Sequence, residues 1–249
     1  MKRFNFQKAK DVYGRQMMAF YLNQHSSEVI EREDGYLDAG GLGGRNYYLS
    51  EYKDWAPFEK ESMKYVKGKV LDIGCGAGRH ALHLQKNSFD VTGIDLSPLA
   101  VQVCKLRGLK KAKVLPVEKI SRLKAGAYDT LLMMGNNFGL FGSFKKAKRL
   151  LNQMRRVTTP KAVILAQTLD PYQTHDSYHL SYHKFNRKRG RMGGQIRLRV
   201  RYKNLIGPWF DYLFVSKKEL QEILKNTGWC LKKVIPSKSS FYIAVIQKQ

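Results

Sequence analysis

The sequence has little cysteine, few acidic residues and no long apolar run. Its three cysteines, Cys75, Cys104 and Cys230, form no CxxC pair, which excludes a disulfide framework, a zinc knuckle and a three-cysteine iron–sulfur motif. No apolar stretch approaches the roughly 18 residues that span a bilayer. The basic start of the chain is not followed by the apolar core of a signal peptide. We therefore expect a cytoplasmic protein without a membrane partner.

The scarcity of acidic residues gives the 249-residue chain a strong positive charge. It has 45 Lys or Arg against 20 Asp or Glu, for a net charge of +25. Residues 1–66 hold ten of each sign, so the whole excess lies in residues 67–249. Residues 180–203 hold nine basic side chains and no acidic one. Such a field favours polyanions or anionic small molecules, although a general basic bias of the surface would give the same pattern.

Residues 1–66 do not follow an α/β rhythm. Residues 8–24 and 57–66 carry helical patterns, and residues 35–48 combine a glycine-rich run with a pair of tyrosines, which predicts a loop followed by an aromatic anchor. We expect this segment to form a helical cap, or lid, on a domain of residues 67–249.

From residue 67 onward, short apolar strands alternate with helices. Strands are predicted at residues 69–73, 90–94, 112–117, 128–134 and 161–168, and helices at residues 78–85, 97–107 and 143–157. Alternating units with continuous apolar strands indicate a parallel sheet covered by helices on both faces. The predicted fold class is therefore α/β and Rossmann-like.

The rhythm breaks after Asp170. Residues 195–202 (QIRLRVRY) alternate strictly between apolar residues and arginine, which predicts a half-exposed strand with a partner at residues 209–215. We expect a β insertion at residues 171–215, after the fifth strand. A helix at residues 216–226 and strands at residues 229–234 and 241–246 complete the prediction.

The motif VLDIGCGAG at residues 70–78 is the main chemical signal, because it follows a strand and opens a helix. Its glycines allow a tight turn and a close approach of the backbone to a ligand. The GxGxG spacing, with Asp72 two residues before the first glycine, differs from the GxGxxG pattern of nicotinamide-binding turns. Asp95 ends the next predicted strand, where a carboxylate accepts hydrogen bonds from both ribose hydroxyls.

With these residues, the sequence resembles the class I S-adenosylmethionine-dependent methyltransferases over residues 67–170. The resemblance implies S-adenosylmethionine as the cofactor and methyl transfer to an N, O or C atom of a small-molecule acceptor. It implies cofactor binding by Asp72, Gly74, Cys75, Gly76, Gly78, Asp95, Leu96, Glu118 and Asn136.

The acceptor pocket is less defined by the sequence. Asn136 and Asn137 follow the fourth strand, at the edge that borders the transferred methyl group in this family. His179 and His183 lie in the insertion, and with Asn137 they are the candidate pocket residues. No acidic cluster accompanies the histidines, so we predict no metal site and name no catalytic base.

Two other functions fit the same sequence. One is an RNA methyltransferase that uses the basic face of residues 179–203 to follow phosphates, with interleaved aromatic residues to stack bases. The other is a cofactor-binding scaffold without turnover. A small-molecule acceptor is preferred, because the chain shows no recognisable appended RNA-binding module, and the positive charge favours an anionic one.

Overall fold

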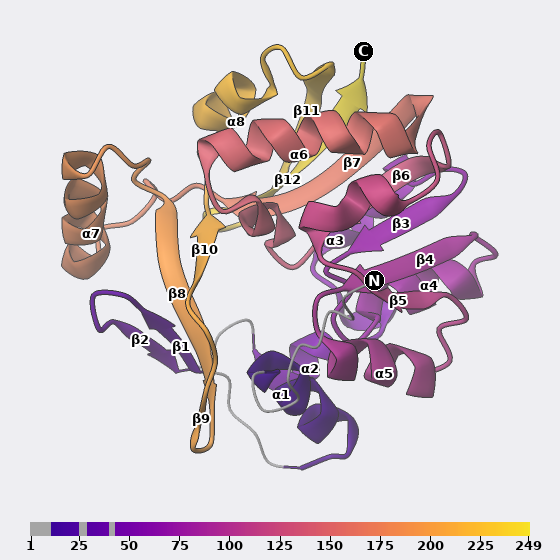
Figure 1. Ribbon diagram of the computed structural model, residues 1–249, viewed down its shortest axis with the longest axis horizontal. Coiled ribbons are helices and arrows are strands. Elements are labelled where there is room, and N and C mark those ends of the chain that lie inside the picture. Colours follow the sequence, from indigo (N-terminus) through magenta and orange to yellow (C-terminus); the bar gives the residue numbers. More distant parts are fainter. Residues whose placement is uncertain (1–10, 25–28, 40–42) are drawn as a thin grey trace.

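A seven-stranded sheet forms the centre of the computed structural model, which describes residues 11–24, 29–39 and 43–249 (Figure 1). Its order is β11-β12-β7-β6-β3-β4-β5. The strands are β3 (Val70–Ile73), β4 (Val91–Asp95), β5 (Ala112–Val114), β6 (Tyr128–Met133), β7 (Thr158–Leu169), β11 (Trp229–Pro236) and β12 (Phe241–Lys248). Strands β3 to β7 are parallel, as predicted.

The last two strands, for which the sequence predicted no direction, are antiparallel. β12 pairs antiparallel with β7, and β11 pairs antiparallel with β12. The short segment 237–240 joins β11 to β12 as a hairpin, whereas a parallel connection needs a crossover of roughly a dozen residues or more.

Helices cover both faces of this sheet, as predicted. They are α4 (Arg79–Lys86), α5 (Pro98–Leu106), α6 (Phe144–Val157) and α8 (Lys217–Leu224), with the 3-10 helices η4 (Val117–Arg122) and η5 (Asn137–Phe141). α6 and α8 pack on one face, and α4 and α5 pack on the other. The side chains of Ser97, Ser143 and Ser216 accept hydrogen bonds from backbone amides of the first turns and so fix where α5, α6 and α8 begin.

The amino-terminal segment contains the predicted helices and also two strands that the prediction did not include. Its elements are α1 (Val12–Tyr21), β1 (Val29–Arg32), β2 (Leu37–Ala39), α2 (Gly44–Tyr48), η2 (Tyr52–Asp54), α3 (Pro57–Ser62) and η3 (Met63–Tyr65). Much of the predicted loop at residues 35–48 is thus β2 and α2, while residues 40–42 lie outside the described residues.

The predicted insertion builds a second sheet beside the first, at the lower left of Figure 1. Its order is β10-β8-β1-β2, with β9 (Leu205–Ile206) also paired to β8. β8 (Gln195–Tyr202) and β10 (Phe210–Leu213) lie at the predicted places. Helix α7 (Ser177–Lys188) was not predicted, although His179 and His183 are four residues apart, which is the spacing of one helix face.

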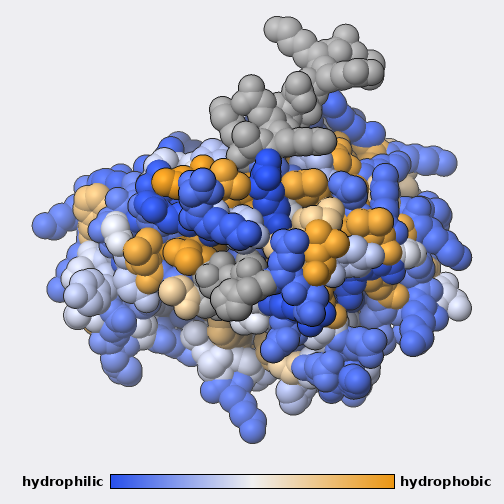
Figure 2. Space-filling model, turned by 90° about the horizontal axis from the view of Figure 1, so that it is seen from below, coloured by the Kyte–Doolittle hydropathy of each residue, from blue (hydrophilic) through white to orange (hydrophobic). Residues whose placement is uncertain are grey.

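β1 connects β2 to the strands of the insertion. One edge of β1 pairs with β2, and the other pairs antiparallel with β8, with Ile30 opposite Val200. The second sheet therefore combines strands from the amino-terminal segment and from the insertion. Viewed from below, the molecule is mostly hydrophilic, with apolar side chains in small groups (Figure 2), as is usual for a surface that faces water.

Candidate active site

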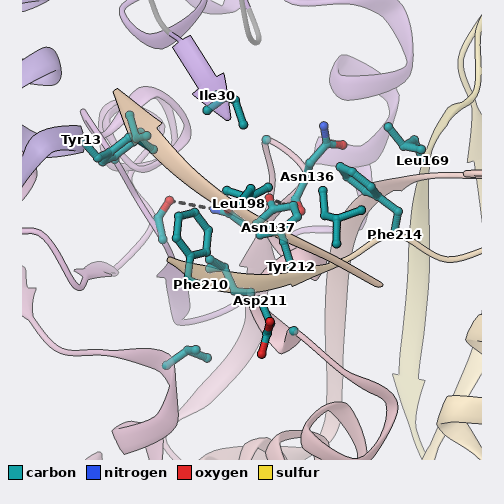
Figure 3. A pocket seen from close by; sticks show the side chains of 18 of the residues that line it. Tyr13, Ile30, Asn136, Asn137, Leu169, Leu198, Phe210, Asp211, Tyr212 and Phe214 are labelled. Carbon is teal, nitrogen blue, oxygen red and sulfur yellow. Dashed lines mark hydrogen bonds between the residues drawn. The ribbon is translucent and has the colours of Figure 1, made fainter. Parts of the chain in front are cut away.

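A cavity of about 870 Å³ lies where the carboxyl ends of β3, β4, β6 and β7 face the second sheet (Figure 3). The loops after these strands form one wall, and the inner faces of β1, β8 and β10 form the other. Tyr13, Tyr47 and Tyr48 of the amino-terminal segment also line it. Open α/β sheets bind their ligands at this edge.

The glycine loop after β3 forms part of the cavity wall. Gly74 and Gly76 line the cavity and have φ angles of +70° and +53°, values that favour glycine. A Cβ atom on Gly74 would stand 2.6 Å from Nδ2 of Asn137, so a larger residue does not fit. Gly78 does not line the cavity and instead precedes α4 as its N-cap.

Cys75 sits within this loop and is 7% exposed. Its Sγ lies 3.7 Å from Sγ of Cys104. The hydrogen bond between the two thiols, together with burial, raises the pKa of Cys75 well above its usual value. A thiol that stays protonated packs as a small apolar group and is not a nucleophile.

Asp72 lies beneath the loop and does not line the cavity. It is 2% exposed, and its Oδ2 has no hydrogen-bond partner. Burial, followed by the charge of Asp95, raises its pKa to about 7. A buried carboxylate oxygen without a partner is costly, so this position favours a cationic group on the far side of the loop.

Asp95 lies at the end of β4 and lines the cavity. Its Oδ2 accepts a hydrogen bond from the Gly76 amide at 2.9 Å, and its Oδ1 accepts one from the Ser97 amide at 2.8 Å. Burial raises its pKa to about 6. Each oxygen keeps a lone pair for a hydroxyl donor. The neighbouring Leu96 is apolar yet 42% exposed.

Glu118, which the resemblance implied as a cofactor contact, lines the cavity at the start of η4. Its Oε1 lies 2.7 Å from Nζ of Lys146, which also lines the cavity. Any contact between Glu118 and an adenine amine would therefore share this carboxylate with Lys146.

Asn136 and Asn137 follow β6 and have different roles. Nδ2 of Asn137 donates to the carbonyl oxygens of Ile73 and Gly74, at 3.0 and 2.8 Å. Asn137 therefore ties this turn to the glycine loop. Asn136 is 6% exposed, has a φ angle of +64°, and its Oδ1 has no hydrogen-bond partner.

The two predicted histidines lie on α7 and line the same cavity as Asn137. Nδ1 of His179 lies 3.0 Å from Nη1 of Arg32, a β1 residue that the sequence did not suggest. Burial, followed by the charge of Arg187, lowers the pKa of His183, and its buried Nδ1 has no hydrogen-bond partner. His183 is therefore neutral near pH 7.

Two further groups support the site and escaped prediction from the sequence. Asp11, the N-cap of α1, accepts hydrogen bonds from Oγ of Ser97 and the amide of Leu99, at 2.9 and 3.0 Å. Arg79 forms a buried ion pair with Glu59, with Nη1 to Oε1 at 2.6 Å. Both contacts join the amino-terminal segment to elements next to the glycine loop, and their partners are too distant in sequence for local patterns to reveal.

Within the described part of the chain, no group of three or more His, Cys, Asp or Glu side chains is placed to hold a metal ion. None of the helices in these ranges is long and apolar enough to cross a bilayer.

Comparisons with known proteins agree with this arrangement. A family model described as a methyltransferase domain matches residues 70–161. The ubiquinone biosynthesis O-methyltransferase of Bordetella avium is 35% identical over 71 residues, which cover 26% of this chain and 30% of that protein. The protein of the same name from Acinetobacter baumannii (strain AYE) is 25% identical over 178 residues, 67% of this chain and 65% of its own length. The matches thus span about a third to two thirds of these curated relatives.

One solved structure covers nearly the whole chain. It is the crystal structure of an S-adenosylmethionine-dependent methyltransferase from Bacteroides fragilis in complex with S-adenosyl-L-homocysteine. It superposes with a TM-score of 0.80 at 26% identity and covers 96% of this chain and 95% of that one.

The sheet, the glycine loop after β3 and the carboxylate after β4 define an α/β protein that binds a nucleoside-containing cofactor. The comparisons then narrow the class. Residues 70–161 match a methyltransferase domain, and the chain is similar in fold and sequence to the class I S-adenosylmethionine-dependent methyltransferases, whose cofactor is S-adenosylmethionine.

The affinity for the cofactor is expected to fall as the pH drops below about 6. A ribose hydroxyl bound at Asp95 would donate to the ionised carboxylate, whose pKa is raised to about 6. At lower pH this carboxyl must lose a proton before it binds, so its contribution makes the affinity fall by at most about tenfold per pH unit. Calorimetry with S-adenosylhomocysteine between about pH 5 and about pH 8 measures this effect.

The Asp95→Asn variant is the control for this titration. It retains the contribution of His80, whose pKa is lowered by burial, and removes that of Asp95. It also lowers the pKa of Asp72, because the charge of Asp95 is one of the two causes that raise it. A pH profile as steep as that of the wild type would show that another group is responsible.

Proposed function

We propose that this protein transfers a methyl group from S-adenosylmethionine to an N, O or C atom of a small-molecule acceptor. The observation that carries the proposal is the continuity of one cavity from the glycine loop and Asp95 to the aromatic residues of β10. When bound, the cofactor supplies a methyl group on a positively charged sulfur. The protein has to hold and orient both reactants and exclude water.

The residues present fit this cofactor. Asp95 offers free lone pairs to two ribose hydroxyls, and Gly74 and Gly76 leave room for the methionine part. The exposed apolar surface of Leu96 suits the face of a purine ring. Asp72 is set behind the loop, so we assign its unpartnered oxygen to the cofactor's ammonium group through a bridging water.

We also propose that residues 1–66 act as a lid over this site. Tyr13 and Tyr48 line the cavity, and their rings pack edge to face with centroids 5.9 Å apart. Asp11 and the Glu59–Arg79 pair fasten the segment to α5 and α4. A segment fastened in this way keeps water from the reacting groups.

The outer face of β8 supports a small molecule over RNA as the acceptor. Arg199 and Arg201 both bind Glu31, and Arg197 pairs with Asp211. Each arginine of this stripe therefore already has an acidic partner. Three arginines here face two carboxylates, Glu31 of β1 and Asp211 of β10, so this stripe is a weaker phosphate track than its sequence suggested.

Two measurements test the proposed function. Calorimetry should show binding of S-adenosylhomocysteine and not of NAD. The protein is then incubated with methyl-labelled S-adenosylmethionine and, separately, with a cytoplasmic metabolite extract or with total tRNA. We expect label in a small molecule. Label in tRNA would favour the RNA reading, and cofactor binding without any labelled acceptor would favour a scaffold.

A further inference from the structure

The main chain of Asn136 is held in a fixed place at the edge of the cavity. Its main-chain carbonyl oxygen accepts hydrogen bonds from Oη of Tyr212 at 2.6 Å and from the Gly139 amide at 2.8 Å. The ring of Tyr212 packs so closely on Gly139 that a Cβ atom there would stand 1.9 Å from it. Tyr212 therefore supports the left-handed backbone of Asn136, which is otherwise uncommon for a residue other than glycine.

Asn136 also stands between the two halves of the site. On one side, its neighbour Asn137 donates to the carbonyl oxygen of Gly74 in the glycine loop. On the other side, the pocket is walled by Phe210, Tyr212 and Phe214 (Figure 3). This is where a methyl group held by the glycine loop would meet an acceptor held against the aromatic wall.

The amide oxygen of Asn136 lacks a partner at this point. Oδ1 is buried without a hydrogen bond, although the residue lines the cavity. A buried hydrogen-bonding oxygen that has no donor costs free energy. An N–H or O–H group of a bound molecule would donate to such an amide oxygen.

We propose that Oδ1 of Asn136 binds the hydrogen of the acceptor's nucleophile, so that the acceptor presents a hydroxyl or an amine that carries hydrogen. This inference rests on the proposed function and narrows it. With its hydrogen directed at Oδ1, the nucleophile turns a lone pair toward the methyl carbon. The new bond forms at that carbon, the sulfur–carbon bond breaks with its electron pair left on sulfur, and the product releases its proton to water.

Tyr212 is a positioning residue in this scheme. It does not have to touch the nucleophile, and it acts by holding the main chain of Asn136. Loss of its hydroxyl would let the turn relax and move Oδ1 away from the point of transfer.

The test compares two cofactor analogues and needs no acceptor. Sinefungin carries an amino group in place of the sulfur-bound methyl, whereas S-adenosylhomocysteine carries nothing there. If Oδ1 faces that position, sinefungin gains a charge-assisted hydrogen bond. Asn136→Gly, which tolerates the positive φ, should weaken sinefungin about tenfold or more and change S-adenosylhomocysteine by less than about threefold.

Three variants complete the comparison. Asn136→Ala also removes the side-chain amide and replaces the glycine variant if that variant fails to fold. Asn136→Asp restores an oxygen and should keep the preference for sinefungin. Tyr212→Phe should lower the preference part of the way, whereas a merely structural role would weaken both analogues alike.

The outcomes separate this inference from the proposed function. If neither analogue binds the wild type, the proposed function is wrong and the inference falls with it. If both bind and the ratio of their affinities is the same in the glycine or alanine variant, the role of Asn136 is wrong and the proposed function stands. A labelled product that is a quaternary ammonium, a sulfonium or a C-methyl compound would also overturn the inference.

Discussion

Glu59→Gln is expected to lower the free energy of unfolding by about 3 kcal/mol, because it leaves the charge of Arg79 buried without a counter-charge. The two side chains are 3% and 7% exposed. Burial opposes ionisation of Glu59, but the His80 imidazole, with Nε2 3.7 Å from Oε1, and the hydrogen bonds from Arg79 outweigh it and hold its pKa at about 2. Thermal unfolding should show a melting temperature lower by roughly 6 to 12 °C.

A matched control is Glu222→Gln, which breaks the exposed ion pair with Lys225. Surface pairs contribute little, so its melting temperature should stay close to that of the wild type. The stabilising effect of the Glu59 carboxylate should also disappear in the wild type as the pH falls from about 4.5 to about 2, because its pKa is depressed in the folded state. Equal melting temperatures for the two variants would contradict the assignment.

Asp95→Ala is expected to weaken the binding of S-adenosylhomocysteine by about a hundredfold or more. Two hydrogen bonds to an ionised carboxylate are lost, at roughly 1.5 to 3 kcal/mol each. The fold should survive, since Asp95 lies at a strand end and faces the cavity. Calorimetry gives the affinity, and thermal unfolding of the free protein gives the stability.

Asp90→Ala is the control, because Asp90 precedes the other end of the same strand and pairs with Lys69 and Lys111 on the surface. It should leave the affinity unchanged. If Asp95→Ala lowered the melting temperature and left the affinity intact, Asp95 would be a structural residue of the β4 end.

The sequence was sufficient for the main sheet because each strand and helix there carries a local pattern. The alternation of residues 195–202 placed β8 correctly at Gln195–Tyr202. β1 and β2 were not predicted, since the exposed residues Leu37–Ala39 show no apolar alternation. β1 pairs with β8, whose residues lie about 170 positions further along the chain, and local patterns do not report such contacts.

The candidate site likewise contains residues that the sequence predicted and residues that it did not. Asp95 and the glycine loop were predicted because the turn requires those residue types at fixed spacing, and the structure places them in one cavity wall. Arg79, Glu59 and Tyr212 were not predicted as parts of the site. Each acts through a partner on another element, so only the folded arrangement gives these residues a role.

The second sheet combines strands from two distant parts of the chain, and this limits which segments can be exchanged with a relative. β8 is bonded on one edge to β10 and on the other to β1, with Ile30 opposite Val200. A chimaera that received only residues 171–215 from a relative would set a foreign strand against a resident one, with side chains unmatched across the shared wall of the acceptor pocket. Acceptor preference should therefore pass between relatives only when residues 29–39 are exchanged together with the insertion.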